Sequence, residues 1–367
     1  MKLNKVNSKV FLVLAFVFSQ FLCFSQSEMI SDSIPDKGYP YRLPIWGEKA
    51  YEKGYGDQLQ LPLGVNLNYV YAFIDMEISE FALNIGDYDL SEVINIETLN
   101  FTEVSATTSG VNMRADFWLF PFMNIYGLYS KISGGTKVSL QPTWKDAVGN
   151  TILQLPEFGA SVDFDALAYG AGTTLVFGYQ NYFLSTDINY SATETELLDD
   201  QVGVLNLSAR LGYKFDLSKK NPDFFLAAYV GVMNRDFVGA KGSTGSIQFN
   251  EVFPDIDNVF NDRIDTRVAE NNQKIENLNP ISDAGEIVKL KAQNIALEEI
   301  QGKVNESGAF TTSINYFIKK DMIQTRTFQF GFNLQLNKHL MFRGEYGVSG
   351  SQKFILTGLQ YRFGIKK

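Results

Sequence analysis

The sequence predicts an all-β fold, a transmembrane antiparallel β-barrel of about ten strands (eight to twelve) with an extracellular helical insertion. Three observations predict it: a targeting segment at the N-terminus, repeated stretches of alternating apolar and polar residues, and connections that alternate between short and long. The composition agrees, because 45% apolar and 14% aromatic residues with only 10 prolines suit strands better than a disordered chain.

The first residues, 1–26, have the features of a secretory signal peptide. Lys2, Lys5 and Lys9 form a positively charged start, and the apolar stretch "VFLVLAFVFSQFLCF" follows it. The small residues of "SQSE" then place cleavage near Ser25 or Gln26. A membrane anchor is the alternative, but the stretch is short for a span and contains Ser19 and Gln20. No later run approaches the ~20 apolar residues that a spanning helix needs, so strands must cross the membrane.

Cysteine usage and charge narrow the class of protein. Cys23 is the only cysteine, and bulky Phe21 and Leu22 stand where a lipoprotein cleavage site wants a small residue. We expect it to leave with the signal peptide, so that the mature chain has neither thiol nor disulfide. Removing the three signal lysines leaves 29 of the 32 basic residues against 41 acidic ones, a net charge near −12. With no basic patch, nucleic acid is not an expected partner.

Ten stretches alternate apolar and polar residues and are bounded by turn signals. The predicted strands are 63–76, 107–119, 122–139, 167–179, 182–195, 203–216, 223–238, 325–336, 339–349 and 352–364. We therefore expect residues 61–367 to form the barrel.

The connections between these strands alternate in length. Four are short, namely "FPFM", "QN", "SKKNPD" and "NK", whereas the intervening ones include the long segments 77–106, 140–166 and 239–324. Tight periplasmic turns and longer outer loops produce this asymmetry in transmembrane barrels. An even number of strands also returns the C-terminus to the side on which the N-terminus begins.

Each strand has one apolar and one polar face, and the faces decide between two architectures. A soluble β-sandwich would bury the apolar face, whereas a membrane barrel turns it toward lipid. The signal peptide, the loop asymmetry and the aromatic residues near strand ends favour the barrel. In the closing stretch "KFILTGLQYRFGIKK" we therefore expect Gln360 and Arg362 to face the lumen and four residues to face lipid: Ile355, Leu359, Tyr361 and Phe363.

Aromatic residues gather beside the short turns, as in the interfacial girdle of a membrane barrel. They are Phe117, Trp118, Phe120, Phe122, Tyr179, Tyr182, Phe183, Phe215, Phe224, Phe225, Tyr361 and Phe363.

The polar faces carry charged residues into the predicted lumen. These are Arg114, Asp116, Lys131, Asp187, Arg210, Lys214, Arg235, Arg343, Glu345 and Arg362. A carboxylate pair for acid–base chemistry is one interpretation. Ten strands enclose an interior that side chains nearly fill, and an unpaired ion there is costly, so we expect the charges to pair with one another. A constriction that selects small solutes is the remaining alternative.

The chain from about residue 60 to 367 resembles single-chain bacterial outer-membrane β-barrels of Gram-negative cells. The resemblance rests on the signal peptide and on the terminal strand "LTGLQYRFGIKK", although Phe363 is followed by Gly-Ile-Lys-Lys and is not the last residue. The segment "LPIWGEKAYEKGYGDQLQLPLGVNLNYVY" also looks like the lead-in to the first strand of an uncharacterised outer-membrane family, a similarity that brings no activity with it. The resemblance to outer-membrane barrels implies that outer-membrane lipid and lipopolysaccharide surround the protein. It also implies that the barrel-assembly machinery is a partner during insertion.

The long segment 239–324 does not fit strands. Apolar residues recur at helical spacing in a narrow stripe, namely Phe260, Ile264, Val268, Ile275 and Leu278. "NPIS" breaks this run, and a second helix is expected from 284 to about 304, with apolar residues Ile287, Val288, Leu290, Ile295 and Leu297 over half of its circumference. We expect a helical hairpin whose stripes bury each other or pack on the barrel mouth, acting either as a surface binding element or lid, or as a structural cap. The segment 27–60 is expected in the periplasm, closing that mouth or serving as a tether.

Catalytic motifs and cofactor motifs are not found. The one histidine, His339, falls in a turn, so no Ser–His–Asp arrangement can be built in the lumen, and no His/Cys cluster offers zinc ligands. The glycine-rich "GSTGS" and "GYGDQ" lack phosphate-loop spacing, and the acidic loops lack the regular spacing of a calcium site. We expect a non-catalytic protein without cofactor or metal, structural or narrowly permeable to small solutes. A surface interaction or adhesion protein using 258–304, with an unknown partner, is the alternative, and an enzyme using lumen carboxylates is a third hypothesis.

Overall fold

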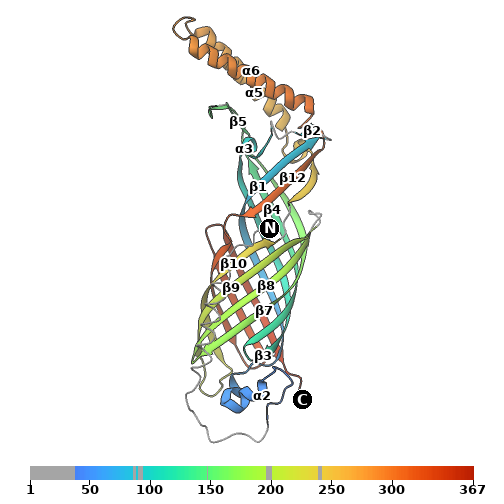
Figure 1. Cartoon of the computed structure of the whole chain (residues 1–367), viewed down its shortest axis with the longest axis vertical. Helices are drawn as coiled ribbons and strands as arrows, with labels where there is room; N and C mark the ends of the chain where they lie inside the picture. The colour runs from blue at the N-terminus through green and yellow to red at the C-terminus, as the bar shows by residue number, and fades with distance from the viewer. Residues whose placement is uncertain (1–37, 86–87, 90–93, 147, 196–200, 239–241) are drawn as a thin grey trace, which may run out of the picture.

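The computed structural model describes residues 38–85, 88–89, 94–146, 148–195, 201–238 and 242–367. The predicted signal peptide and its cleavage site lie outside these residues. The described chain forms a tall barrel with a pair of long helices projecting from one end (Figure 1). Among these residues, none of the helices is both long enough and apolar enough to cross a bilayer.

Ten antiparallel strands close the barrel in chain order. They are β1 (Leu63–Ile85), β3 (Phe101–Phe120), β4 (Met123–Leu140), β7 (Phe158–Tyr179), β8 (Tyr182–Thr195), β9 (Val202–Asp216), β10 (Phe225–Val238), β13 (Arg326–Gln335), β14 (Leu340–Val348) and β15 (Gln352–Phe363). β1 completes the ring because it pairs with β3 on one edge and with β15 on the other, so that Leu67 lies opposite both Met113 and Leu359. Every predicted strand overlaps one of these ten, which confirms the predicted barrel.

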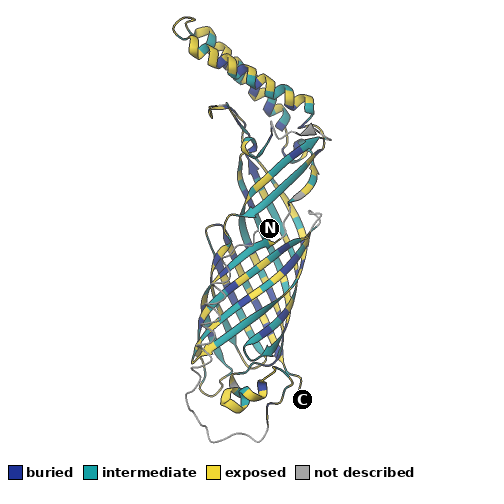
Figure 2. Ribbon diagram, in the orientation of Figure 1, coloured by how far each residue is buried: buried dark blue, intermediate teal, exposed yellow. Residues whose placement is uncertain are grey.

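Side chains on the barrel strands alternate between exposed apolar and buried polar ones, the reverse of a soluble core. On β15, Leu359 and Tyr361 are 49% and 53% exposed, whereas Gln360 and Arg362 are only 6% and 4% exposed. The same alternation of exposed and buried residues runs along the other barrel strands (Figure 2). Because apolar side chains on the outside of a closed barrel need an apolar solvent, the barrel spans a membrane, and the soluble sandwich is excluded.

The apolar outer surface forms a band with a definite height. On β1 it extends from Leu63 to Phe73, close to the ~9–11 residues that a tilted strand needs to cross the hydrocarbon. Above the band the outward positions become charged on one strand after another, at Asp75, Lys131, Asp165, Glu194, Arg326 and Lys353. β1, β3, β4 and β7 continue past this level, so part of the barrel wall stands outside the membrane (Figure 1).

The four predicted short connections all lie at the end of the barrel that holds both the start of β1 and the end of β15. They are residues 121–122, 180–181, 217–224 and 336–339, as predicted; the opposite end carries the three long connections and also two brief ones, 196–201 and 349–351. The N-terminal segment, with α2 (Gly47–Ala50), η1 (Tyr51–Tyr55) and η2 (Gly56–Gln58), packs at the short-turn end. There the Ile45 amide donates to the Leu119 carbonyl oxygen at 2.8 Å, and Tyr41 forms a bridge with Lys366. Burial raises the pKa of Tyr39 in this segment to about 12.

The long connections contain additional strands that the sequence pattern did not predict. β12 (Ile314–Met322) pairs with the upper half of β1, and β11 (Ser243–Ile247) pairs with β12, so the expectation that 239–324 holds no strands is wrong. β2 (Tyr88–Asp89) pairs with the upper end of β1, and β5 (Thr143–Lys145) and β6 (Thr151–Gln154) form a small separate hairpin. Two short helices, α3 (Ile96–Leu99) and α4 (Phe249–Val252), complete this region.

Helices α5 (Ile256–Asn277) and α6 (Ala284–Ser307) form the predicted helical hairpin (Figure 1). Leu290, Leu297 and Val304 are buried on α6, and midway along the hairpin the Asn271 amide nitrogen donates to the Asn294 amide oxygen at 2.8 Å. Val288 and Ile295, which were expected to share the packing stripe, are instead 66% and 65% exposed.

A hydrophobic cluster outside the membrane joins the base of this hairpin to the barrel. This cap core contains Leu83, Ile94, Leu99, Leu140, Trp144, Ile152, Leu153, Leu155, Phe249, Phe253, Ile256, Phe260, Ile264, Leu297, Val304, Ala309, Phe310 and Ile314. Its members come from all three long connections and from the strands that flank them. The base of the hairpin is therefore a structural cap on the barrel mouth, and the rest of the hairpin projects beyond it.

Candidate functional site

The barrel encloses a cavity of about 1540 Å³ that is lined by residues from both of its ends. Leu59 and Asn181 line it near the short turns, and Phe249 and Thr244 line it near the cap core. The wall changes character along the barrel. The part toward the short turns is polar, and we call it the polar floor. The part toward the cap is largely hydrocarbon, apart from Lys319 and Lys320 of β12, and we call it the apolar chamber.

The apolar chamber is built by the inward positions of the strands that rise above the membrane band. Its lining includes Ile74, Met76, Phe81, Leu83, Phe101, Val138, Leu140, Ala160, Phe164, Phe249 and Phe253. Several of these side chains also belong to the cap core or pack against it. Packed side chains of the cap core therefore form part of the outer wall of the chamber.

The first charged cluster of the polar floor is centred on Asp116 of β3. Arg362 of β15 lies 3.0 Å from its carboxylate, and the amide nitrogens of Asn66 and Asn124 donate to it at 2.9 and 2.7 Å. Asp116 and Arg362 are 5% and 4% exposed. Arg362 also donates to the Leu61 carbonyl oxygen at 2.8 Å, which ties the floor to the N-terminal segment.

The second cluster is centred on Glu345 of β14. Its carboxylate lies 3.3 Å from Nε of Arg210 and 3.5 Å from Nη2 of Arg343. It also accepts hydrogen bonds from the Tyr229 hydroxyl at 2.7 Å and from the Gln329 amide at 2.8 Å. One buried carboxylate thus holds together groups from β9, β10, β13 and β14.

The third cluster surrounds Asp187 of β8. The hydroxyls of Tyr126 and Thr174 donate to its carboxylate at 2.8 and 2.6 Å. Arg114 lies next to it, with its guanidinium 3.5 Å from the centre of the Tyr126 ring and a hydrogen bond of 2.8 Å to the Asn124 side chain. Cation, ring and carboxylate therefore form a continuous contact across β3, β4, β7 and β8.

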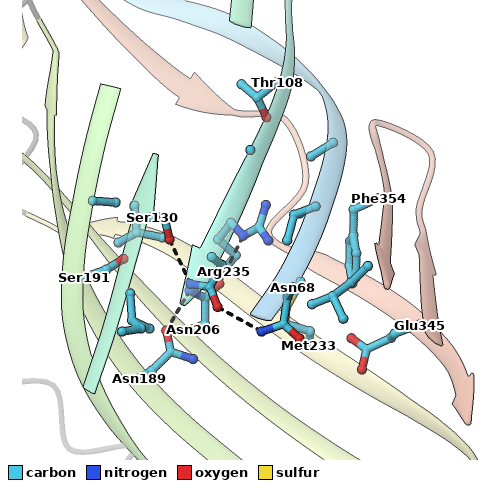
Figure 3. A pocket seen from close by; sticks show the side chains of 18 of the residues that line it. Asn68, Thr108, Ser130, Asn189, Ser191, Asn206, Met233, Arg235, Glu345 and Phe354 are labelled. Carbon is cyan, nitrogen blue, oxygen red and sulfur yellow. Dashed lines mark hydrogen bonds between the residues drawn. The ribbon is translucent and has the colours of Figure 1, made fainter. Parts of the chain in front are cut away.

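Arg235 of β10 belongs to none of these three clusters and, like Arg114, has no ion pair among the described residues. Its Nε donates to the Asn206 side chain at 3.0 Å (Figure 3), and within the described chain no carboxylate lies within 4.0 Å of it. The floor therefore carries more arginine than carboxylate: its arginines are Arg114, Arg210, Arg235, Arg343 and Arg362, and its acids are Asp116, Asp187 and Glu345. The lumen is cationic although the chain as a whole is acidic.

The structure brings together five of the ten predicted lumen charges as mutual pairs: Asp116 with Arg362, and Glu345 with both Arg210 and Arg343. Lys214 lies at the short-turn mouth of the lumen, 3.0 Å from Asp216. Lys131 is a correction, because it is exposed on the outer face of β4, opposite the outward Val111 and Leu167. It lies at the upper edge of the apolar band, where a long side chain reaches the headgroup region with its charge in water.

Three aromatic residues that were expected in the outer girdle face the lumen instead: Trp118, Phe183 and Phe225. They share strand parity with inward residues, and the guanidinium of Arg362 lies 5.8 Å from the Trp118 ring. The neutral members of the clusters were also missed, namely Asn66, Asn124, Tyr126, Tyr229 and Gln329. The sequence could have revealed them, because each is separated by an even number of positions from an inward-facing residue of its own strand and so lies on the same face. Other girdle residues lie as expected, with Trp46 4.8 Å from Phe120 and Tyr182 4.9 Å from Tyr213.

Two features of the sequence bear on metal binding and catalysis, namely the clustering of possible metal ligands and the position of the one histidine. In the part of the chain that the structure describes, no three His, Cys, Asp or Glu side chains gather as metal ligands. The His339 ring lies 5.8 Å from the Tyr361 ring, and its Nδ1 lies 2.8 Å from the Arg362 carbonyl oxygen, so it contacts the girdle at the short-turn end.

Comparisons with known proteins find similarity in shape only. No family model matches the chain, and no curated protein matches it in sequence. Among solved structures, the β domain of the Bordetella autotransporter BrkA matches with a TM-score of 0.34 and 10% identity, covering 82% of this chain and 99% of that one. The outer membrane protease OmpT from Escherichia coli matches with a TM-score of 0.33 and 9% identity, covering 82% and 97%. The KdgM porin matches with a TM-score of 0.26 and 9% identity, covering 81% and 99%. At such values no activity passes from these proteins to this chain.

Proposed function

We propose that the protein is a non-catalytic barrel of the bacterial outer membrane that passes small solutes through a narrow lumen. The observation that carries this proposal is the cavity of about 1540 Å³, which residues from both ends of the barrel line. A purely structural barrel of this strand number would fill its interior with side chains. The helical cap would then limit access from outside, and the N-terminal segment would lie on the periplasmic side.

The polar floor is the proposed constriction. The Asp116, Glu345 and Asp187 clusters project from the barrel strands into the lumen, and each is held by several hydrogen bonds. Because arginines outnumber carboxylates there, the floor favours anions over cations. Solutes that cross it must be small enough to pass between these side chains.

Conductance measurements test the proposal. We expect the mature protein in planar bilayers to give small currents that prefer anions. Replacing Arg210, Arg343 and Glu345 together by alanine should raise the conductance several-fold, since one cluster of the constriction is removed without leaving an unpaired charge. Lys131→Ala, on the outer face, is the matched control and should leave the conductance unchanged. If neither the wild type nor the folded triple variant carried current, passage through this lumen would be refuted.

Surface interaction through the hairpin is the second candidate function. The observation in its favour is an exposed apolar stripe that Val288 and Ile295 form on α6, seven residues apart and 66% and 65% exposed, and that Ile281, 90% exposed, continues in the turn before the helix. Such spacing suits a partner helix. The stripe lies beyond the cap core, so its role is separable from the stability of the cap.

Shortening the hairpin tests this second candidate. Residues 269–296 replaced by a short Gly-Ser turn would remove the tip while retaining Phe260, Ile264, Leu297 and Val304 in the cap core. We expect unchanged barrel stability and a loss of surface binding by whole cells, and Ile295→Glu should give the same loss in the full-length hairpin. Binding that survives both changes would remove the hairpin from consideration.

A further inference from the structure

The apolar chamber is more hydrophobic than the passage of polar solutes requires. Phe81, Phe101 and Phe164 line it at a level where the outer surface of the barrel is already polar. Keeping such a wall in contact with water is unfavourable by about 25 cal/mol per Å² of apolar surface. A chamber that is open and apolar is therefore suited to an apolar occupant.

The volume of the cavity fits this interpretation. About 1540 Å³ exceeds the roughly 300–1,000 Å³ that suffice for a drug-sized ligand. The cap core packs along the outer part of the chamber wall. An occupant would thus be largely removed from water, which is the condition under which burial of hydrocarbon contributes most to affinity.

A cation lies where the chamber meets the polar floor. Arg235 sits beside the small apolar cluster of Ala72, Met233 and Phe354, and its guanidinium is 5.9 Å from the Phe354 ring. Figure 3 shows Arg235 together with Asn206, Asn189 and Ser191 around the pocket. Asn206 donates in turn to Asn189 at 3.1 Å, so polar groups that bind oxygen atoms surround the arginine.

The charge of Arg235 lacks compensation from the protein itself. Within the described residues its hydrogen bond goes to the neutral Asn206 side chain, whereas Arg210, Arg343 and Arg362 each have a carboxylate. A guanidinium binds a carboxylate through paired, charge-assisted hydrogen bonds. A neutral hydrocarbon in the chamber would leave this charge as it is, and a bound anion would neutralise it.

We propose that the chamber binds an amphipathic carboxylate, with its hydrocarbon part against the apolar wall and its carboxylate on Arg235. This rests on the proposed function in one respect, because the bound molecule would be the solute that the barrel takes up. A long-chain fatty acid and an aromatic acid share this chemistry. They differ in how much of the chamber they fill, so a longer hydrocarbon binds more tightly, by about 0.8 kcal/mol per buried CH₂.

Equilibrium binding to the full mature protein held in lipid nanodiscs tests the proposal. The probes are hexadecanoate, hexadecanol, benzoate and acetate, and binding is measured by native mass spectrometry against empty nanodiscs. We expect hexadecanoate to bind the protein more tightly than benzoate, and acetate to bind undetectably. Equal binding of benzoate and hexadecanoate would contradict the role of the long apolar chamber.

The Arg235 variants separate the headgroup from the chain. Arg235→Gln removes an uncompensated charge, so the barrel should fold, and hexadecanoate should bind at least about tenfold more weakly because a charge-assisted hydrogen bond is lost. Arg235→Lys should retain most of the affinity, hexadecanol should bind the wild type and Arg235→Gln equally, and Lys131→Gln on the outer face should have no effect. Unchanged hexadecanoate affinity in Arg235→Gln would overturn the assignment. If hexadecanoate bound but the barrel carried no current, only the proposed passage of solutes would be refuted. If the barrel carried current but did not bind hexadecanoate, only the proposed carboxylate site would be refuted.

Discussion

Glu345→Ala is expected to lower the free energy of unfolding of the barrel by about 3–5 kcal/mol. The carboxylate is 6% exposed and lies within 3.5 Å of both Arg210 and Arg343. Its removal leaves two cations facing each other in the lumen, and it deprives the Tyr229 hydroxyl and the Gln329 amide of their acceptor. Urea unfolding in lipid vesicles, followed by tryptophan fluorescence, measures the change.

The control for this experiment is a carboxylate that pairs on the surface. Glu80 lies 2.8 Å from Lys319, but its side chain is 56% exposed, so Glu80→Ala should change the stability by less than about 1 kcal/mol. Replacing the whole ion cluster by apolar residues, with Arg210→Met, Arg343→Met and Glu345→Leu, should recover most of the loss. Equal effects of Glu345→Ala and Glu80→Ala would show that the lumen is wet enough to screen the charges.

Met113→Arg is expected to destabilise the inserted barrel by about 2–4 kcal/mol, the cost of an arginine on the lipid face at mid-depth. Met113 is 52% exposed and has Leu67 and Tyr129, 54% and 49% exposed, directly opposite it on the neighbouring strands. The three define the middle of the apolar band. Folding into vesicles of saturated lipid, assayed by the shift in gel mobility of unheated samples, gives the population of folded barrel.

Thr107→Arg is the matched control, because Thr107 lies on the same face of the same strand but at the upper edge of the band, opposite Phe73. An arginine there sits in water or among headgroups, and the loss should not exceed about 1 kcal/mol. If both substitutions had the same effect, the boundary between lipid and water would not lie between Met113 and Thr107, and the membrane placement of the barrel would have to change.

The barrel strands were predictable because two different solvents act on their two faces. On β9, lipid selects Leu205, Leu207 and Leu211, while the lumen selects Asn206 and Arg210, so the period of two appears directly in the sequence. β12 was not predicted because apolar and polar residues do not alternate regularly in its sequence, "INYFIKKDM". There Phe317 and Ile318 are adjacent although they point to opposite faces, and a lysine, Lys320, lines the cavity.

The candidate site was predictable as a set of charges and not as a set of contacts. The alternation of side chains along a strand suffices to predict that Asp116 and Arg362 face the lumen. Their pairing, however, joins β3 to β15 and depends on the register that β1 makes with both of these strands. That register depends on how all ten strands close. Lys131 and Trp118 were misplaced for a simpler reason: residue type, charged or aromatic, was given more weight than the parity of the strand, and parity decides.

The cap core has a consequence for the order of biogenesis. Its aromatic and aliphatic members come from three separate connections, all of which must traverse the bilayer before they can meet on the far side. The pairing of Met76 with Met322 likewise joins residues that are far apart in the sequence, and such non-local contacts form slowly during folding. We therefore expect the cap to assemble last. Once it has formed, removing a strand hairpin from the membrane would carry packed rings back through hydrocarbon, so the cap is expected to oppose the reversal of insertion.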